Sequence, residues 1–296
     1  MIKSPCMEKR KRFRIGLRSR SLVLGERTLV MGVLNVTPDS FSDGGSFLNP
    51  EQAVAHALEL EQAGADILDI GGESTRPSSQ GVSAEEELRR VIPVLRGLDG
   101  KLRIPISIDT QKSEVADAAL EAGAEIVNDI SALRVDPRMG RAARMHRAPV
   151  VLMHMRGTPR TMQQGPFARN VLRDVTAGLK QAVARARSAG IQKSQIILDL
   201  GIGFGKSYAQ NFELLARLPE LARLGYPLLV GTSRKAFIGA TLGSAKNPLP
   251  PQERVWGTAA TVTAAILGGA HIVRVHDVKE IAQVVRIADA IRNARF

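Results

Sequence analysis

The sequence predicts an α/β protein built as a single (β/α)8 TIM barrel, preceded by a basic, flexible N-terminal extension. Eight short runs rich in Val, Ile and Leu recur along the 296 residues, and longer amphipathic stretches separate them. Aromatic residues make up only 4% of a chain that is 44% hydrophobic, a composition suited to helices packed closely on strands. We expect the extension over residues 1–20 and one barrel domain over residues 21–296.

The eight apolar runs are the predicted strands of the barrel. They occupy residues 28–36, 66–72, 104–110, 125–130, 149–155, 195–201, 227–233 and 271–277. Continuous apolar runs of this length are typical of parallel strands that are covered on both faces. An open, doubly wound sheet is the alternative, but it needs fewer strands for a chain of this length.

The stretches between the strands are predicted helices. Three glycines stand just before the next strand, where helix C-caps belong: Gly64, Gly123 and Gly190. In the last stretch, over residues 277–294, the apolar residues fall on one helical face: Ile281, Val284, Val285, Ala288 and Ile291. Eight strands alternating with such helices is the count of a (β/α)8 barrel.

Charge and cysteine content limit the classes of protein to consider. The formal net charge is +12, and residues 1–20 carry eight basic residues against one acid, Glu8. We interpret this arm as a solvated tail, because no basic groove or nucleic-acid motif follows it. No uncharged apolar stretch is long enough to span a membrane, and arginines interrupt any signal-peptide core. The lone Cys6 fits a reducing compartment, so we predict a cytoplasmic protein.

Polar residues follow the predicted strands, and in a TIM barrel the carboxyl ends of the strands carry the chemistry. These residues are Asn35, Asp69, Asp109, Asn128, His154, Asp199, Ser233, Arg234, Lys235, Arg274 and His276. In the last strand Arg274 and His276 alternate with Val273 and Val275, so both cationic candidates point toward the mouth. Carboxylates and amides suit the N–H groups of a heterocycle, and cations suit a phosphate or carboxylate. The residue types therefore predict a flat nitrogenous substrate that bears an anionic group.

Three loops at these strand ends are unusual. Residues 35–45 (NVTPDSFSDGG) predict a loop that closes over substrate, and residues 71–81 (GGESTRPSSQG) offer Arg76 as an anion-binding fork. Residues 201–207 (GIGFGKS) resemble two phosphate loops and match neither. A P-loop requires a glycine where Leu200 stands, and the dinucleotide pattern fails because its third glycine comes one residue early. We interpret this segment as a glycine-rich barrel loop that lets Phe204 approach a ligand.

No metal-ligand cluster and no nucleophile elbow appears in the sequence, which argues against zinc and serine hydrolases. The motifs instead resemble those of the dihydropteroate synthases over about residues 29–280. The resemblance is carried by several long motifs in the same order: NVTPDSFSDGG, GGESTRP, the IDT and NDI strand ends, MHMRGTPRTMQ (153–163), DLGIGFGK (199–206), GTSRKAFIG (231–239) and HDV (276–278).

The resemblance implies a transferase that joins a pterin diphosphate to 4-aminobenzoate, through a pterin-methyl cation. It implies catalytic roles for Asp109, Asp199, Lys235 and Asp43. Pterin diphosphate would be bound by Thr75, Asp109, Asn128, Asp199, Lys235, Arg274 and His276, with Asn35 helping to bind Mg2+. The 4-aminobenzoate site would be framed by Arg76, Pro77, Phe204, Ser233 and Phe41. Phe41 and Asp43 would arrive when the first loop closes, and the family suggests a homodimer.

The sequence departs from the family pattern at two places. Leu200 stands where the family usually has proline, and Ser78 with Ser79 replace the small residues common after STRP. The second change puts the affinity for 4-aminobenzoate and for sulfonamides in question. Two alternatives remain: a methyltetrahydrofolate:corrinoid methyltransferase, which would share the Asp and Asn pterin contacts, and a nucleic-acid-binding protein that uses the basic arm.

Overall fold

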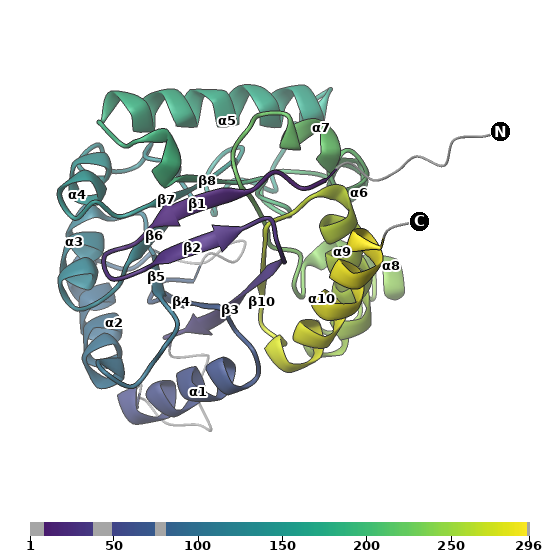
Figure 1. The fold of residues 1–296 in the computed structure, drawn as a ribbon. Helices are drawn as coiled ribbons and strands as arrows, with labels where there is room; N and C mark the ends of the chain where they lie inside the picture. Colours follow the sequence, from purple (N-terminus) through teal and green to yellow (C-terminus); the bar gives the residue numbers. More distant parts are fainter. Residues whose placement is uncertain (1–8, 38–48, 75–80, 295–296) are drawn as a thin grey trace.

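The computed structural model describes residues 9–37, 49–74 and 81–294, and within them eight parallel strands close into a barrel (Figure 1). Neighbouring strands follow chain order, and β10 pairs with β3 to close the cylinder. The strands are β3 Leu29–Asn35, β4 Ile67–Gly71, β5 Ile106–Asp109, β6 Ile126–Asp129, β7 Val150–Met153, β8 Ile196–Asp199, β9 Leu228–Val230 and β10 Ile272–Val275. Each lies inside one predicted apolar run, so the predicted (β/α)8 barrel is confirmed.

Helices surround the strands as an outer ring (Figure 1). They are α1 Pro50–Gln62, α2 Ala84–Leu98, α3 Ser113–Glu121, α4 Met139–Met145, α5 Val171–Ser188, α6 Tyr208–Ala216, α7 Leu218–Ala222, α8 Ala236–Leu242, α9 Val255–Gly268 and α10 Val278–Asn293, with short 3-10 turns η2 Lys193–Gln195 and η3 Pro251–Glu253. None of these helices is long and apolar enough to cross a membrane, as far as the described residues show.

The three helix ends predicted from glycines are confirmed. Gly64, Gly123 and Gly190 come after α1, α3 and α5, and all three have positive φ. That left-handed conformation lets the chain turn back toward the next strand. One detail of the prediction for α10 is wrong, because Ile291 is 51% exposed. It lies in the last turn, where Asp289 takes the buried position and binds the backbone N–H of Thr28.

Alternate residues of each strand face opposite sides, and this separates the apolar core into layers. Val30, Val127 and Val273 belong to the large cluster between strands and helices. Met31, Ile126 and Ile272 belong to a second cluster inside the lower half of the barrel. The same alternation leaves the inward positions at the carboxyl ends of the strands to polar residues, so the interior is apolar at the bottom and polar at the mouth.

Part of the predicted extension is folded. Strands β1 Phe13–Gly16 and β2 Ser21–Leu24 form an antiparallel hairpin in which Ile15, Leu22 and Leu24 are buried. These three side chains join the apolar cluster inside the lower barrel, so the hairpin covers its bottom, as Figure 1 shows. The expectation of a flexible arm is therefore wrong for residues 9–20.

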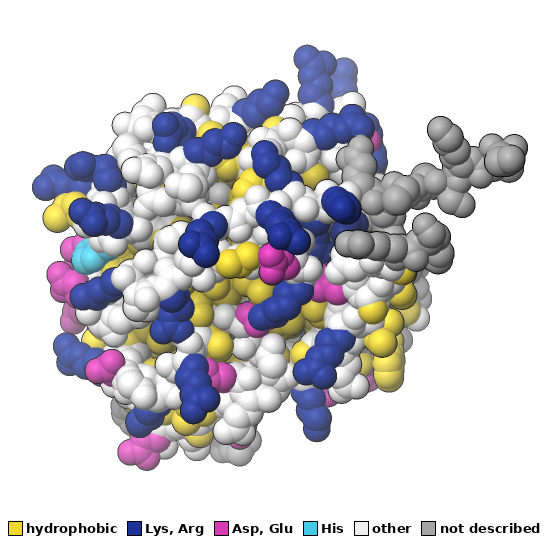
Figure 2. Space-filling view, viewed as in Figure 1, with side chains coloured by type: hydrophobic (Ala, Val, Ile, Leu, Met, Phe, Trp, Pro, Cys, Tyr) yellow, Lys and Arg dark blue, Asp and Glu magenta, His cyan; other side chains and the backbone are white. Residues whose placement is uncertain are grey.

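The physical reason is the alternation of apolar and basic residues in this segment, which suits a strand with one face buried. Arg14 points outward beside Ile15, and Arg10 turns inward to bind Asp289 at 2.9 Å. Figure 2 shows Lys and Arg side chains gathered over this face of the molecule. The arm's positive charge is thus carried on a folded cover, and the expected boundary at residue 21 cuts through the hairpin.

Candidate active site

Strand register places the predicted polar residues side by side at the mouth. Asn35 pairs with Gly71, Gly71 with Asp109, and Asp109 with Asn128. Across the barrel, Asp199 is the last residue of β8 and lies beside Met153 of β7. Asp109, Asn128 and Asp199 are all buried. The structure therefore brings these predicted residues together at one end of one barrel.

A buried charge cluster forms the floor of the mouth. The Arg274 guanidinium donates from Nε to Asp69 at 2.6 Å and from Nη2 to Asp109 at 2.8 Å. Burial lowers the pKa of Arg274, but the two carboxylates outweigh burial and raise it above its ordinary value. Burial also raises the pKa of Asp109 to about 7, with Arg274 acting in the opposite direction. The cluster therefore holds one cation between two carboxyl groups, and burial raises the pKa of one of them, Asp109.

Asp69 was not predicted as a site residue. The sequence analysis included it among the polar residues at strand ends without a binding or catalytic role, and the structure shows it fully buried. Its Oδ2 accepts from both Arg274 and the Asn128 amide, at 2.6 Å and 3.0 Å. Asp69 thus orients two residues predicted to bind substrate. The available signal was its position at the end of an apolar strand, two residues before the GGESTRP motif.

Asp199 and Lys235 face the mouth from β8 and from the start of α8. Asp199 accepts a hydrogen bond from the Gly201 N–H at 2.8 Å. Burial raises its pKa, while Gly201, Lys235 and Arg274 act in the opposite direction. Burial lowers the pKa of Lys235 to about 8, helped by Arg274 and opposed by Asp199 and Asp109. The Lys235 ammonium lies 4.1 Å from the ring centroid of Phe204, so the two predicted residues meet.

Ser233 and His276 form a second pair at the mouth. The Ser233 hydroxyl lies 3.0 Å from Nδ1 of His276 and accepts from its backbone N–H. The neighbouring Arg234, predicted to join an anion site, instead binds Asp277 through its side chain. Of the two consecutive cations at this helix start, Lys235 is therefore the one that faces the mouth.

Two histidines lie away from the predicted site. His154 was expected at the mouth, but its ring packs against α5, where a Cβ on Gly178 would lie 2.4 Å from it. The alternation of β7 explains this, because Met153 and Met155 take the inward positions on either side. His271 is buried at the barrel bottom, where Nδ1 accepts from the Leu228 N–H at 3.2 Å and Nε2 lies 2.9 Å from the Lys11 carbonyl oxygen.

An apolar cluster borders the polar mouth. It contains Ile130, Met153, Met155, Met162 and Phe204, all buried. Only Phe204 was predicted from the sequence. The other four lie in or after β6 and β7, and the alternation of Met153 with His154 and Met155 was the signal that could have found them. Such side chains suit the face of a flat ring, while the carboxylates suit its edge.

Five predicted residues lie outside the described part of the chain: Phe41, Asp43, Thr75, Arg76 and Pro77. The residues just before the second loop are well anchored. Arg90 donates to the Gly72 carbonyl oxygen at 2.8 Å. The Lys112 ammonium forms ion pairs with both Glu73 and the fully buried Glu87. These contacts attach the start of the GGESTRP loop to α2 and to the segment after β5.

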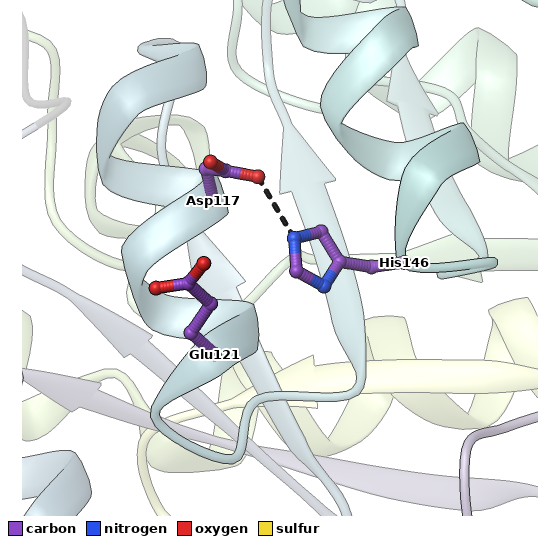
Figure 3. A group of neighbouring side chains, drawn as sticks. All are labelled: Asp117, Glu121 and His146. Atoms are coloured by element: carbon purple, nitrogen blue, oxygen red, sulfur yellow. Dashed lines mark hydrogen bonds and ion pairs between the residues drawn. The ribbon is translucent and has the colours of Figure 1, made fainter.

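In the described chain, the predicted metal ligand and one clustered group of side chains are the places to consider for a metal ion. At the mouth, the half-buried Asn35 ends β3 and offers an amide oxygen. A second group is Asp117, Glu121 and His146, whose ligand atoms lie within 4.8 Å of one another (Figure 3). That group lies on α3 and at the end of α4, outside the barrel. His146 Nε2 and Asp117 Oδ1 are 2.8 Å apart, and this hydrogen bond accounts for the contact without an ion.

Comparisons with known proteins agree with this geometry. The family model for pterin binding enzymes matches residues 31–276. A dihydropteroate synthase from Synechocystis sp. is 52% identical over 267 residues, covering 90% of this chain and 91% of that protein. The chain belongs to the dihydropteroate synthase family. Another member, from Escherichia coli strain K12, is 47% identical over 266 residues, covering 90% of this chain and 92% of its own.

Solved structures of dihydropteroate synthases have the same fold. The Yersinia pestis enzyme, solved with a sulfonamide drug complex, matches with a TM-score of 0.88 and 44% identity, covering 95% of this chain and 100% of that chain. The Xanthomonas albilineans enzyme in complex with 7,8-dihydropteroate matches with a TM-score of 0.84 and 43% identity, covering 95% of this chain and 100% of that chain. The resemblance inferred from motifs is therefore confirmed over nearly the whole dihydropteroate synthase barrel.

Proposed function

We propose that this protein condenses 6-hydroxymethyl-7,8-dihydropterin diphosphate with 4-aminobenzoate to give 7,8-dihydropteroate and diphosphate, as a transferase of folate biosynthesis. One observation carries the proposal: buried carboxylates, an amide and two cations gather beside an apolar cluster at one barrel mouth. Carboxylates and amides bind the N–H edge of a flat heterocycle, and cations balance an anion. The identity to dihydropteroate synthases makes the pterin the favoured heterocycle.

The pterin ring is proposed to bind between Asp109, Asn128, Asp199 and Lys235. Asp199 pairs with the guanidine-like edge of the ring, since an ionised carboxylate accepts two parallel N–H bonds. The apolar side chains Met153 and Ile130 border this space and suit the ring face. This arrangement uses the carboxylates for recognition and for charge stabilisation alike.

The proposed reaction is dissociative. The C–O bond to diphosphate breaks, its electron pair leaves with diphosphate, and a cation forms on the exocyclic methylene carbon. The pterin ring spreads this positive charge toward Asp109 and Asp199, which stabilise it electrostatically. The amino nitrogen of 4-aminobenzoate then attacks the carbon and releases one proton, so the atoms and charges balance. Arg274, His276 and Thr75 are proposed to contact the departing diphosphate.

Mg2+ fits the chemistry of the Asn35 position. Mg2+ prefers oxygen ligands, keeps several waters, and is usually bound by one or two protein groups together with substrate phosphates. Asn35 offers one such oxygen at the mouth, on the same ring of strand ends as Asp109. When bound, the ion would stabilise negative charge on the leaving diphosphate. We propose that Asn35 helps to hold it.

The 4-aminobenzoate site is proposed to lie between Phe204, Ser233 and the two loops that carry Phe41, Arg76 and Pro77. Arg76 provides a planar fork for the carboxylate. Asp43 is proposed to arrive with the first loop, and closure would exclude water from the cation. Ser78 and Ser79 follow Pro77, so sulfonamide binding is the direct measure of how they change this site.

Diphosphate release tests the function. Purified protein with the pterin diphosphate, Mg2+ and 4-aminobenzoate is expected to form dihydropteroate and diphosphate in equal amounts. Omitting 4-aminobenzoate should prevent dihydropteroate formation. A corrinoid methyltransferase is the second candidate because it would share the pterin contacts. Methyl transfer without any condensation product would therefore overturn the proposal.

A homodimer is proposed through α6, α8 and α9. These helices carry exposed apolar side chains, of which Trp256 is 79% exposed. They adjoin one another, because the ring of Phe212 packs edge-on against Phe237 at 5.0 Å and Gly257 faces Leu242. Trp256→Glu should shift the protein toward monomer in analytical ultracentrifugation, whereas Met145→Glu on α4 should not. A wild-type monomer would refute this.

We further propose a cytoplasmic location.

A further inference from the structure

Lys206 is a buried cation that the proposed reaction does not use. It ends the GIGFGK segment after β8 and is only 2% exposed. Its ammonium donates to the carbonyl oxygens of Gly201 at 2.8 Å, Phe204 at 3.0 Å and His154 at 3.3 Å. An ammonium has three donors, so these carbonyls match its full capacity. The contacts join the loop after β8 to the loop after β7.

The backbone polar groups of this loop point the opposite way to those of a phosphate loop. Phosphate loops point backbone N–H groups at an anion, whereas here carbonyl oxygens point at the loop's own lysine. Gly201, Gly203 and Gly205 all have positive φ. A Cβ would lie 1.9 Å from the His154 carbonyl oxygen at Gly201 and 2.4 Å from that of Arg156 at Gly205. The glycines therefore permit this conformation, and Lys206 satisfies its carbonyls.

Phe204 is the side chain that this loop presents to the mouth. Its carbonyl is bound by Lys206, its ring belongs to the apolar cluster, and the Lys235 ammonium lies 4.1 Å from the ring centroid. The loop has four further hydrogen bonds. The Gly201 N–H donates to Asp199, the Gly203 N–H to Asn211, and the Gln163 amide to the Gly203 carbonyl oxygen. The Phe204 N–H donates to the Gly201 carbonyl oxygen at 3.0 Å and closes a turn, and Lys206 is the side chain that binds both carbonyls of that turn, at Gly201 and Phe204.

We propose that Lys206 is a positioning residue that holds Phe204 in place at the 4-aminobenzoate side of the mouth, by using its ammonium to bind three carbonyl oxygens of the surrounding loops. The inference rests on the proposed function. It assigns to the lysine of the GIGFGKS motif a role inside the protein rather than a contact with phosphate. Loss of the ammonium should therefore weaken the use of 4-aminobenzoate more than the binding of the pterin.

The protonation state of Lys206 decides whether its side chain can bind all three carbonyl oxygens. A neutral amine has only two donors and cannot serve three carbonyls. Burial lowers the pKa of Lys206 to about 7, with Lys235 acting in the same direction and Asp199 and Asp174 in the opposite one. The ammonium is therefore lost as pH rises through that value. The KM for 4-aminobenzoate should rise with it, because Phe204 is then less firmly held.

The test compares Lys206→Met with Lys180→Met, a matched change at an exposed lysine of α5. In Lys206→Met we expect the KM for 4-aminobenzoate to rise about tenfold or more, since small misplacements of binding groups carry large costs. The pterin dissociation constant should change less than about threefold, and Lys180→Met should match wild type. Hydrogen exchange of the 201–206 amides should become faster, while β7 and β8 stay protected.

Three results would overturn the inference. The first is an unchanged KM for 4-aminobenzoate in a folded Lys206→Met variant. The second is an equal loss of pterin and 4-aminobenzoate binding, which would mean a general structural role. The third uses wild type alone and needs no variant to fold: a KM for 4-aminobenzoate that stays flat from about pH 6 to about pH 9. Hydrogen exchange tests the positioning role of Lys206 independently of the proposed condensation reaction. The 201–206 amides should exchange faster in Lys206→Met even if the wild-type protein forms no dihydropteroate.

Discussion

Arg274 lies with its Nε 2.6 Å from Oδ2 of Asp69, a residue 205 positions earlier in the chain. The same guanidinium binds Asp109; the two carboxylates are buried and the Arg274 side chain is 21% exposed. Both carboxylates therefore depend on one cation. The proposed pterin site is built on this arrangement, since Asp109 and the Asp69-bound Asn128 are two of its members.

Arg274→Met should destabilise the protein by roughly 3–5 kcal/mol, because it leaves two buried carboxylates without their cation. Urea unfolding measures this directly. The double variant Asp69→Asn with Arg274→Met should recover part of the stability, since one of the two charges is gone, but it should remain inactive. A single variant as stable as wild type would show that the cluster is not coupled as described.

Asp199→Asn should weaken pterin binding by about 10–100-fold, because hydrogen bonds to a charged group are worth roughly 1.5–3 kcal/mol. The fold should persist, since an asparagine oxygen can still accept from the Gly201 N–H. Calorimetry with a pterin ligand gives the affinity, and Asp99→Asn at an exposed position serves as the control. Unchanged affinity would place the pterin elsewhere in the mouth.

Lys235→Ala should reduce turnover by about 100-fold with little change in melting temperature, since its ammonium is proposed to donate hydrogen bonds that orient the pterin ring for reaction. The pKa of Lys235 is lowered to about 8 by burial, so the ammonium is present below that pH and lost above it. Turnover in wild type should accordingly fall as pH rises through about 8. A large drop in melting temperature would instead make Lys235 a structural residue.

Removing residues 1–20 should lower stability by roughly 2–4 kcal/mol, because Ile15 and its neighbours would no longer cover the apolar bottom of the barrel. Removing residues 1–8 alone is the matched control and should leave stability near wild type. Urea unfolding gives both values. Condensation activity should survive in the folded fraction, since the hairpin lies at the end of the barrel opposite the mouth. Equal stability of all three proteins would contradict the role of the hairpin.

The periodicity of the sequence was enough to predict the barrel and the direction of many side chains. Each apolar run contains a strand, and the alternation in residues 271–277 placed Arg274 inside the barrel and Val273 against the helices. The glycines after α1, α3 and α5 marked helix ends. These features depend on a residue and its nearest neighbours, so a linear pattern records them.

Which side chains bind one another was decided only by the tertiary structure. Arg274 meets Asp69 and Asp109 because the barrel closes and brings β10 beside β3 and across from β5. Lys206 binds its own loop because glycines with positive φ turn the carbonyls inward. The basic arm folds because Ile15 finds an apolar surface made from most of the barrel strands. Such contacts join residues far apart in the chain, and their geometry exists only once the cylinder has closed.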